Sequence, residues 1–160
     1  MTTESDLKEL ISNCFIENQK RLYLTAVSIT QNHFSAEDAL QEAYLKIMKK
    51  YRQLNDVKFA KTWITRIVIN QCKDMLKANK RIVAQNVQED ISCFENFDDE
   101  ELRFYDMIRS LSLKDREIMI LKYFDGHNLN EISMILKIPL STVKSRLYRT
   151  LEKIKSEWSD

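Results

Sequence analysis

Glycine and proline are almost absent from this chain, whose 160 residues contain one of each. Tight β-hairpins depend on these residues, so a fold of short strands and turns is disfavoured. A glycine-rich loop that cradles phosphates is close to excluded for the same reason. Long periodic stretches without breakers favour helices, and the sequence therefore predicts an all-α fold.

Cysteines are few, and long apolar runs are missing. Cys14, Cys72 and Cys93 are an odd number at wide spacing, which matches neither a disulfide framework nor a zinc site, so we expect reduced thiols. No apolar run is long enough to span a bilayer, and the first ten residues lack the basic and apolar regions of a signal peptide. A cytoplasmic location without membrane insertion is expected.

Catalytic patterns are also missing. There is no nucleophile elbow and no HExxH helix. His33 and His127 each stand without a carboxylate or second histidine nearby in sequence, which disfavours metal binding and acid-base chemistry. The sequence predicts neither an enzyme nor a bound cofactor or metal.

Neither sign of charge is in large excess overall, but positive and negative residues are strongly segregated along the chain. The net charge is +1. Residues 58–81 hold seven cations and one acid, residues 82–106 hold one cation and eight acids, and residues 137–155 hold six cations and one acid. Two basic blocks separated by an acidic one favour contact with nucleic acid despite the ordinary total.

The acidic stretch 82–101 lacks an apolar period and is predicted to be a flexible linker. It divides the chain into two small helical domains, 1–81 and 102–160. The linker either screens the basic faces in the free protein or is a plain solvated connector.

Residues 128–155 read as two short helices around a turn. Asn128 and Glu131 form a capping pair that starts the first helix. Residues 137–140 include the only proline and interrupt the period, and Ser141 is placed to cap the second helix. The second helix has one apolar side, made of Val143, Leu147, Leu151 and Ile154.

The other side of this second helix is polar and basic. At about 100° per residue, Thr142, Ser145 and Arg149 project together, with Lys144 and Arg146 on the flanks. Short hydroxyls and forked cations suit a helix in the DNA major groove. The alternative is an ordinary amphipathic hairpin with a solvated basic face.

A helix from Ser35, capped with Asp38, to about Tyr51 shows an unusual outward side. Leu40, Ala43, Tyr44, Ile47 and Tyr51 face inward. Asp38, Gln41, Glu42 and Leu45 face outward. An exposed leucine beside acids indicates a contact patch, although isolated exposed leucines are common.

The next predicted helix, about 60–80, also has two distinct sides. Its apolar side consists of Ile64, Val68, Cys72, Met75 and Leu76, and its polar side of Arg66, Asn70, Lys73, Asp74 and Lys77. Trp63 lies near the polar side. Cations, amides and an aromatic ring together suit single-stranded nucleic acid. The alternative is that Trp63 packs against a neighbouring helix.

Three stretches in this order resemble the extracytoplasmic-function (ECF) family of bacterial RNA polymerase sigma factors. They are AEDALQEAYLKIMKKY (36–51), FAKTWITRIVINQCKDMLKANKR (59–81) and LSLKDREIMILKYFDGHNLNEISMILKIPLSTVKSRLYRTLEKIK (111–155). The resemblance implies a sigma-2 domain, a flexible linker and a helix-turn-helix sigma-4 domain. It implies a sigma factor that binds core RNA polymerase and promoter DNA, under control of a separate, membrane-anchored anti-sigma factor.

The resemblance also implies roles for individual residues. The core-polymerase contacts would be Asp38, Gln41, Glu42 and Leu45. The contacts with the separated strand of the −10 element would be Lys61, Trp63, Arg66, Asn70, Asp74, Lys77 and Arg81. The contacts with the −35 duplex would be Ser141, Thr142, Lys144, Ser145, Arg146 and Arg149.

Three positions depart from the family pattern. Ser133 stands where the family often has alanine, and Lys137 and Ser141 stand where it often has glycine. Lys137 is therefore expected to impose a less relaxed turn. Two other functions remain open from the residues alone: a stand-alone helix-turn-helix regulator, which needs only the C-terminal half, and an all-α adaptor without a nucleic-acid role.

Overall fold

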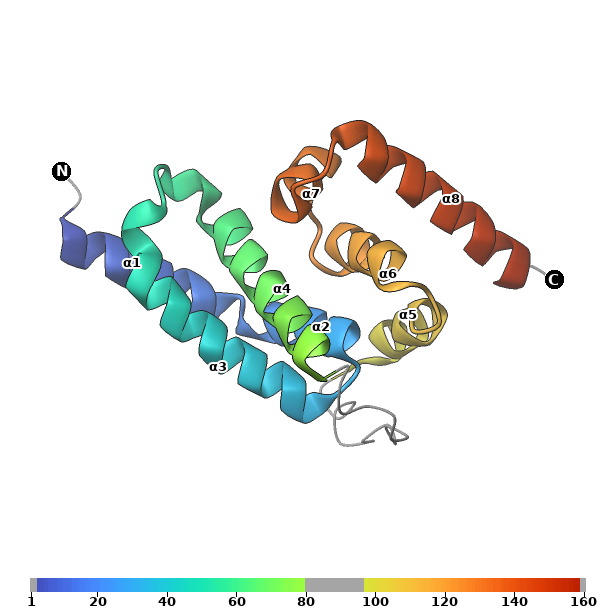
Figure 1. Ribbon diagram of the computed structural model, residues 1–160, viewed down its shortest axis with the longest axis horizontal. Coiled ribbons are helices and arrows are strands. Elements are labelled where there is room, and N and C mark those ends of the chain that lie inside the picture. The colour runs from blue at the N-terminus through green and yellow to red at the C-terminus, as the bar shows by residue number, and fades with distance from the viewer. Residues whose placement is uncertain (1–2, 80–96, 159–160) are drawn as a thin grey trace. The chain divides into compact units, whose positions relative to one another are not determined.

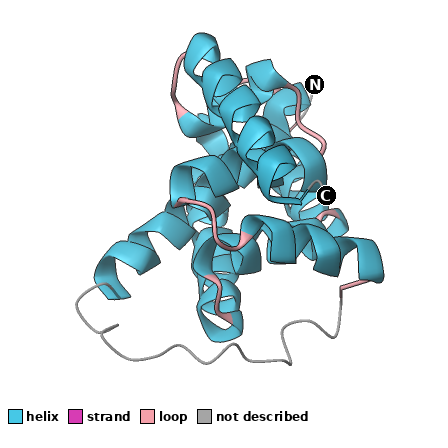
Figure 2. Cartoon of the chain, turned by 90° about the vertical axis from the view of Figure 1, so that its right-hand side faces the viewer, coloured by secondary structure: helices cyan, strands magenta, loops and turns pink. Residues whose placement is uncertain are grey.

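The computed structural model describes residues 3–79 and 97–158. These residues form helices and loops with no strand, in agreement with the predicted all-α class (Figure 2). The chain divides into two compact units, Met1–Asp90 and Ile91–Asp160. The predicted flexibility of the acidic linker, the role of Arg81 and the state of Cys93 lie outside the described residues.

The described part of unit 1, residues 3–79, is a bundle of four helices, drawn blue to green in Figure 1: α1 (Glu4–Glu17), α2 (Gln19–Thr30), α3 (His33–Lys50) and α4 (Ala60–Asn79). Two single 3₁₀ turns, η1 (Tyr51–Gln53) and η2 (Val57–Phe59), connect α3 to α4. Helices α2, α3 and α4 pack against one another, and α1 packs on α4. Their shared core is aliphatic and includes Ile11, Leu22, Ile29, Ile47, Ile64 and Ile69.

Helix α3 begins three residues earlier than predicted, at His33. The Asn32 side chain accepts a hydrogen bond from the Ser35 N–H at 2.9 Å, so Asn32 caps the helix and the predicted Ser35–Asp38 pair does not. Asparagine is as good an N-cap as serine, so cap preference alone does not decide between Asn32 and Ser35. The end of the preceding helix, α2, decides which residue is the cap. The preceding residue, Gln31, ends α2 in the left-handed region with φ of 56°.

Unit 2 contains α5 (Asp99–Ile108), α6 (Leu113–Met119), the π-helical turn η4 (Ile120–Phe124), α7 (Leu129–Leu136) and α8 (Leu140–Trp158). Helices α6 and α7 both pack on α8. Asp98 caps α5 by accepting the Glu101 N–H at 2.8 Å, so this helix starts inside the segment that the sequence assigns to the linker.

The helix pair α7–α8 forms as the capping pattern predicts. Asn128 accepts the Glu131 N–H at 2.8 Å, and Glu131 accepts the Asn128 N–H at 3.1 Å. The predicted cap at Ser141 is wrong, because α8 already begins at Leu140 and the Pro139 carbonyl accepts the first helical N–H groups. A proline immediately before the first turn loses no helical hydrogen bond, so it suits this position.

The turn between α7 and α8 is held in an unfavourable backbone conformation. Lys137 ends α7 in the left-handed region with φ of 54°, where a side chain crowds the backbone. The Ser133 hydroxyl donates to the Ile138 carbonyl at 2.6 Å and so fixes the same turn. Two of the three departures from the family pattern, Ser133 and Lys137, therefore act on this turn.

The two described cysteines are free thiols, as predicted. Cys72 lies in the core of unit 1, and burial raises its pKa to about 12. Because the thiolate is the reactive form, this thiol is expected to be inert.

Replacing Lys137 with glycine should stabilise the protein. Glycine adopts positive φ without steric cost, whereas other residues cost about 1–2 kcal/mol there. Part of this gain is offset by the extra freedom of glycine in the unfolded chain, so we expect Lys137→Gly to raise the free energy of unfolding by about 0.5–1 kcal/mol. Urea unfolding of the full chain measures this, with Lys137→Ala as control. Equal stabilities of the two variants would contradict a strained turn.

Candidate polymerase and nucleic-acid interfaces

The outward side of α3 carries the predicted contact patch. Ala39, Ala43 and Ile47 are fully buried against the rest of unit 1, so the opposite side of the helix faces solvent. That side presents Asp38, Gln41, Glu42 and Leu45, the α3 stripe, all of which are exposed. The Leu45 side chain is 54% exposed, which confirms the expected apolar residue among acids.

Sequence reasoning missed Phe34 on this side. It lies four residues before Asp38, one helical turn away on the same face, and is 66% exposed. The helix starts early enough to include Phe34 because Asn32 is the cap. The i, i+4 spacing from Asp38 was the signal, and the misplaced cap concealed it.

The outward side of α4 carries most of the predicted −10 contacts. Ile64, Val68 and Cys72 are buried on the inner side. At about 100° per residue, five of the predicted contacts share the opposite side, the α4 face. They are Trp63, Arg66, Asn70, Asp74 and Lys77. The last three are exposed, whereas Trp63 and Arg66 are half-buried.

Lys61 does not belong to the α4 face. It lines a groove of about 580 Å³ in unit 1, with Glu9 and Cys14 of α1 among the other lining residues. Lys61 precedes Arg66 by five residues, which is about 140° beyond a full turn and places it on another side of the helix. The structure therefore places Lys61 on another side of α4 from the five residues of the α4 face, and its role at the −10 element stays a prediction.

The outward side of α8 carries all six predicted −35 contacts. Val143, Leu147, Thr150 and Ile154 are buried against unit 2. Ser141, Lys144, Ser145 and Arg149 are exposed, while Thr142 and Arg146 are half-buried at the flanks. We call these six residues the α8 face. Cations surround short hydroxyls on it, as a groove-reading helix requires.

Tyr148 adds an aromatic ring to this side and was missed from the sequence. It directly precedes Arg149 in the sequence, and its side chain is 59% exposed. Its position three residues after Ser145 was a sufficient signal, because residues at that spacing share a helix side.

Arg149 is in contact with another helix of unit 2. Its Nη2 lies 3.5 Å from Oδ1 of Asp115, in the first turn of α6. The Arg149 side chain is 70% exposed, whereas that of Asp115 is 15% exposed. The ion pair therefore joins a largely buried acid to a largely solvent-exposed cation.

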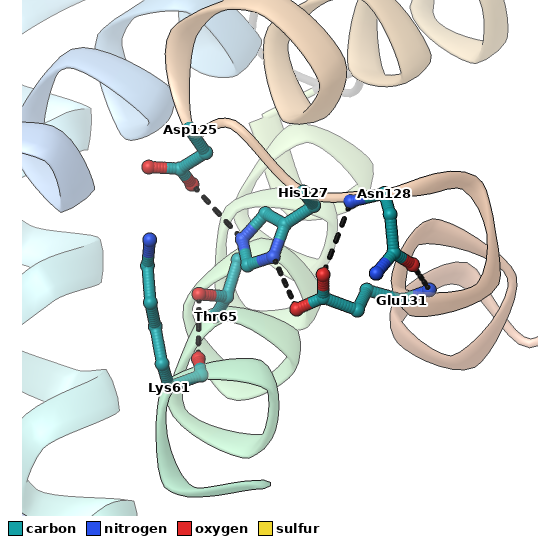
Figure 3. A network of polar contacts seen from close by, with 6 residues as sticks. All are labelled: Lys61, Thr65, Asp125, His127, Asn128 and Glu131. Carbon is teal, nitrogen blue, oxygen red and sulfur yellow. Dashed lines mark hydrogen bonds and ion pairs between the residues drawn. The ribbon is translucent and has the colours of Figure 1, made fainter.

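A buried polar cluster supports the entry to α7 (Figure 3). His127 Nδ1 lies 3.3 Å from Glu131 Oε2, and His127 Nε2 lies 3.7 Å from Asp125 Oδ2. The expectation that His127 stands without nearby carboxylates is wrong, since both acids lie within four residues of it. Because Glu131 also caps α7, the cluster fixes the first turn of that helix.

His33 likewise has a carboxylate nearby. Its Nε2 lies 3.4 Å from Glu37 Oε1, one turn along α3, and Nδ1 contacts the Tyr23 hydroxyl. Within residues 3–79 and 97–158, no three His, Cys, Asp or Glu side chains are grouped to hold a metal ion. None of the helices in these ranges has the length and apolarity that crossing a bilayer requires.

Two family models match the chain, one in each unit. Residues 14–82 match Sigma-70 region 2, and residues 101–154 match Sigma-70 region 4. The first match includes α3 and α4, and the second includes the α7–α8 pair. The match in the N-terminal half argues against a regulator that needs only the C-terminal helix pair.

Curated relatives are similar over most of their length. The chain is 32% identical over 134 residues to the ECF RNA polymerase sigma-E factor of Escherichia coli (strain K12), which covers 73% of this chain and 70% of that protein. It is 25% identical over 154 residues to the RNA polymerase sigma factor SigV of Bacillus subtilis (strain 168), a match that covers 95% of this chain and 93% of that protein.

Solved structures show a similar fold. The sigma factor RpoE from Bartonella quintana, solved with the anti-sigma factor NepR, matches with a TM-score of 0.74 at 21% identity, covering 91% of this chain and 96% of that chain. CnrH, solved with the cytosolic domain of CnrY, matches with a TM-score of 0.67 at 16% identity, covering 93% and 94%. The region matches, the sigma-E identity and this fold together place the chain in the ECF family of RNA polymerase sigma factors, the regulatory proteins that direct transcription initiation from specific promoters.

Proposed function

We propose that the three outward helix sides divide the work of a sigma factor among them. The α3 stripe binds core RNA polymerase, the α4 face holds the −10 element and the α8 face reads the −35 element. The observation that carries this proposal is that each set of polar side chains lies opposite the side its helix buries. Residues 1–81 and 102–160 are the two working domains, and residues 82–101 connect them.

The chemistry of the α3 stripe suits a protein partner. Two acids and an amide surround an exposed leucine, so a partner with cations around an apolar contact is complementary. Core polymerase is that partner, and the protein acts in the cytoplasm, where polymerase and DNA are found.

The chemistry of the α4 face suits a separated DNA strand. Lys77 and Arg66 supply positive charge for phosphates, Asn70 supplies an amide for a base edge, and Trp63 supplies a ring for stacking. A base taken out of the duplex and held on this face would favour the melted promoter over the closed one.

The chemistry of the α8 face suits duplex DNA. The cations Lys144, Arg146 and Arg149 lie around Thr142 and Ser145, whose short side chains allow close approach to base edges. Arginine forms two hydrogen bonds with guanine, whereas lysine acts on phosphate as a point charge.

A separate anti-sigma factor controls access to these faces. Of the two similar solved structures, the sigma factor RpoE is bound to the anti-sigma factor NepR, and CnrH is bound to the cytosolic domain of CnrY. We expect this anti-sigma factor to be membrane-anchored and to cover the α3 stripe or the α8 face. Its inactivation would free the covered face.

Charge reversal of the α3 stripe should abolish binding to core polymerase. In Asp38→Arg with Glu42→Arg, cations would face the cations of the partner, which costs several kcal/mol, so we expect at least about 100-fold weaker binding. Fluorescence anisotropy with purified core polymerase measures the affinity. Glu9→Arg with Glu17→Arg on α1 makes the same change in net charge on exposed sites and should bind normally. Equal affinities of all variants would refute the assignment of α3.

Removal of the Trp63 ring should weaken capture of single-stranded DNA. One stacked base contributes about 1–3 kcal/mol, so holoenzyme with Trp63→Ala should bind a −10 non-template oligonucleotide about 5- to 150-fold more weakly. Trp63→Phe keeps an aromatic ring and should lose less. The alternative, packing of the ring within unit 1, predicts lower thermal stability with unchanged oligonucleotide binding by the folded fraction.

Two cations of the α8 face should behave differently on substitution. Arg149→Ala should cost about 1–3 kcal/mol at one −35 base pair and relax the preference there. Lys144→Ala should weaken binding to all −35 sequences uniformly and reduce the salt slope by about 1. Binding of holoenzyme to a library of −35 variants at two salt concentrations separates the effects. A uniform loss for both variants would mean that Arg149 contacts only phosphate.

A further inference from the structure

We infer that Asp115 is a positioning residue for Arg149: it holds the guanidinium over the α8 face and so sharpens the reading of one −35 base pair. This inference rests on the proposed role of the α8 face. It assigns a function in DNA recognition to α6, a helix to which the proposed function gives no role.

The acid is held more firmly than the arginine it contacts. Asp115 lies in the first turn of α6, and its N–H donates to the Ser112 hydroxyl at 3.3 Å. A carboxylate in a first turn is further stabilised by the helix dipole. Helix α6 packs directly on α8, which fixes the distance between the acid and the base of the Arg149 side chain.

The contact leaves most of the guanidinium available for DNA. One terminal nitrogen of Arg149 faces Asp115 at 3.5 Å, and the guanidinium carries five N–H donors in a planar fork. The remaining donors suffice for the two hydrogen bonds that arginine forms with guanine. With the side chain 70% exposed, a base edge has access to those donors.

An anchored guanidinium loses less conformational freedom when it binds a base. A free arginine side chain carries about 2 kcal/mol of rotamer entropy, and a preset orientation removes part of that cost before DNA arrives. A contact of two hydrogen bonds requires one orientation of the guanidinium, so the reduced entropy cost favours binding to the correct base. A phosphate contact accepts many orientations and gains little from the preset orientation.

The same carboxylate must also weaken DNA binding in general. It places a negative charge behind a surface that approaches phosphates, and this repulsion does not depend on base sequence. Asp115 therefore has two effects of opposite sign: it raises discrimination and lowers overall affinity. If the residue only supported the fold, its removal would lower both discrimination and overall affinity.

The test uses holoenzyme and the −35 base pair at which Arg149→Ala relaxes the preference. With Asp115→Asn, discrimination at that base pair should fall about 2- to 5-fold, the range expected for an exposed ion pair, while affinity for all −35 sequences rises. Asp115→Glu, which keeps the charge, should retain part of the discrimination. Glu152→Gln removes an equal charge from the exposed side of α8 and should raise affinity without changing discrimination.

Each outcome decides between explanations. Unchanged discrimination in Asp115→Asn would overturn the positioning role while leaving the α8 assignment intact. A further loss when Asp115→Asn is added to Arg149→Ala would also overturn it, because the acid would then act without the arginine. If Arg149→Ala relaxes no base pair, Arg149 contacts only phosphate, and its proposed base contact and this inference both fail.

Discussion

Burial of a single apolar side per helix is the constraint on which the structure of both units depends. Each unit is small, so every long helix must use its one apolar side for the core, and the opposite side is left to solvent. The α3 stripe, the α4 face and the α8 face are the sides left over in this way. The proposed interfaces with polymerase and DNA therefore need no dedicated loops, and the helices that make the core also hold the proposed contact residues.

Much of this arrangement was predictable because helical periodicity is local. The outward position of Leu45 and the capping box of Asn128 with Glu131 follow from residues three and four apart. The α8 face follows from one apolar repeat in the same way. Charge segregation along the chain indicated the basic helices, although the net charge of +1 did not.

The errors arose where two local signals compete or where the third dimension decides. The predictions took Ser35 and Ser141 as caps, whereas the earlier residues Asn32 and Pro139, which also suit a helix start, precede the first helical residues in the structure. Lys61 was assigned from resemblance, and only the packing of α1 beside α4 shows that it lines another surface. The contact of Arg149 with Asp115, 34 residues apart, has no sequence signal at all.

We propose that this single chain reads two separate DNA elements while it is bound to polymerase. In vitro transcription with core polymerase on a library of randomised promoters tests it most directly. We expect active promoters to share two short elements at a fixed spacing, of which the upstream one is read as duplex. Transcription by core polymerase that does not require this chain would contradict it. Enrichment of a single inverted repeat, as expected for a dimeric helix-turn-helix regulator, would also contradict it.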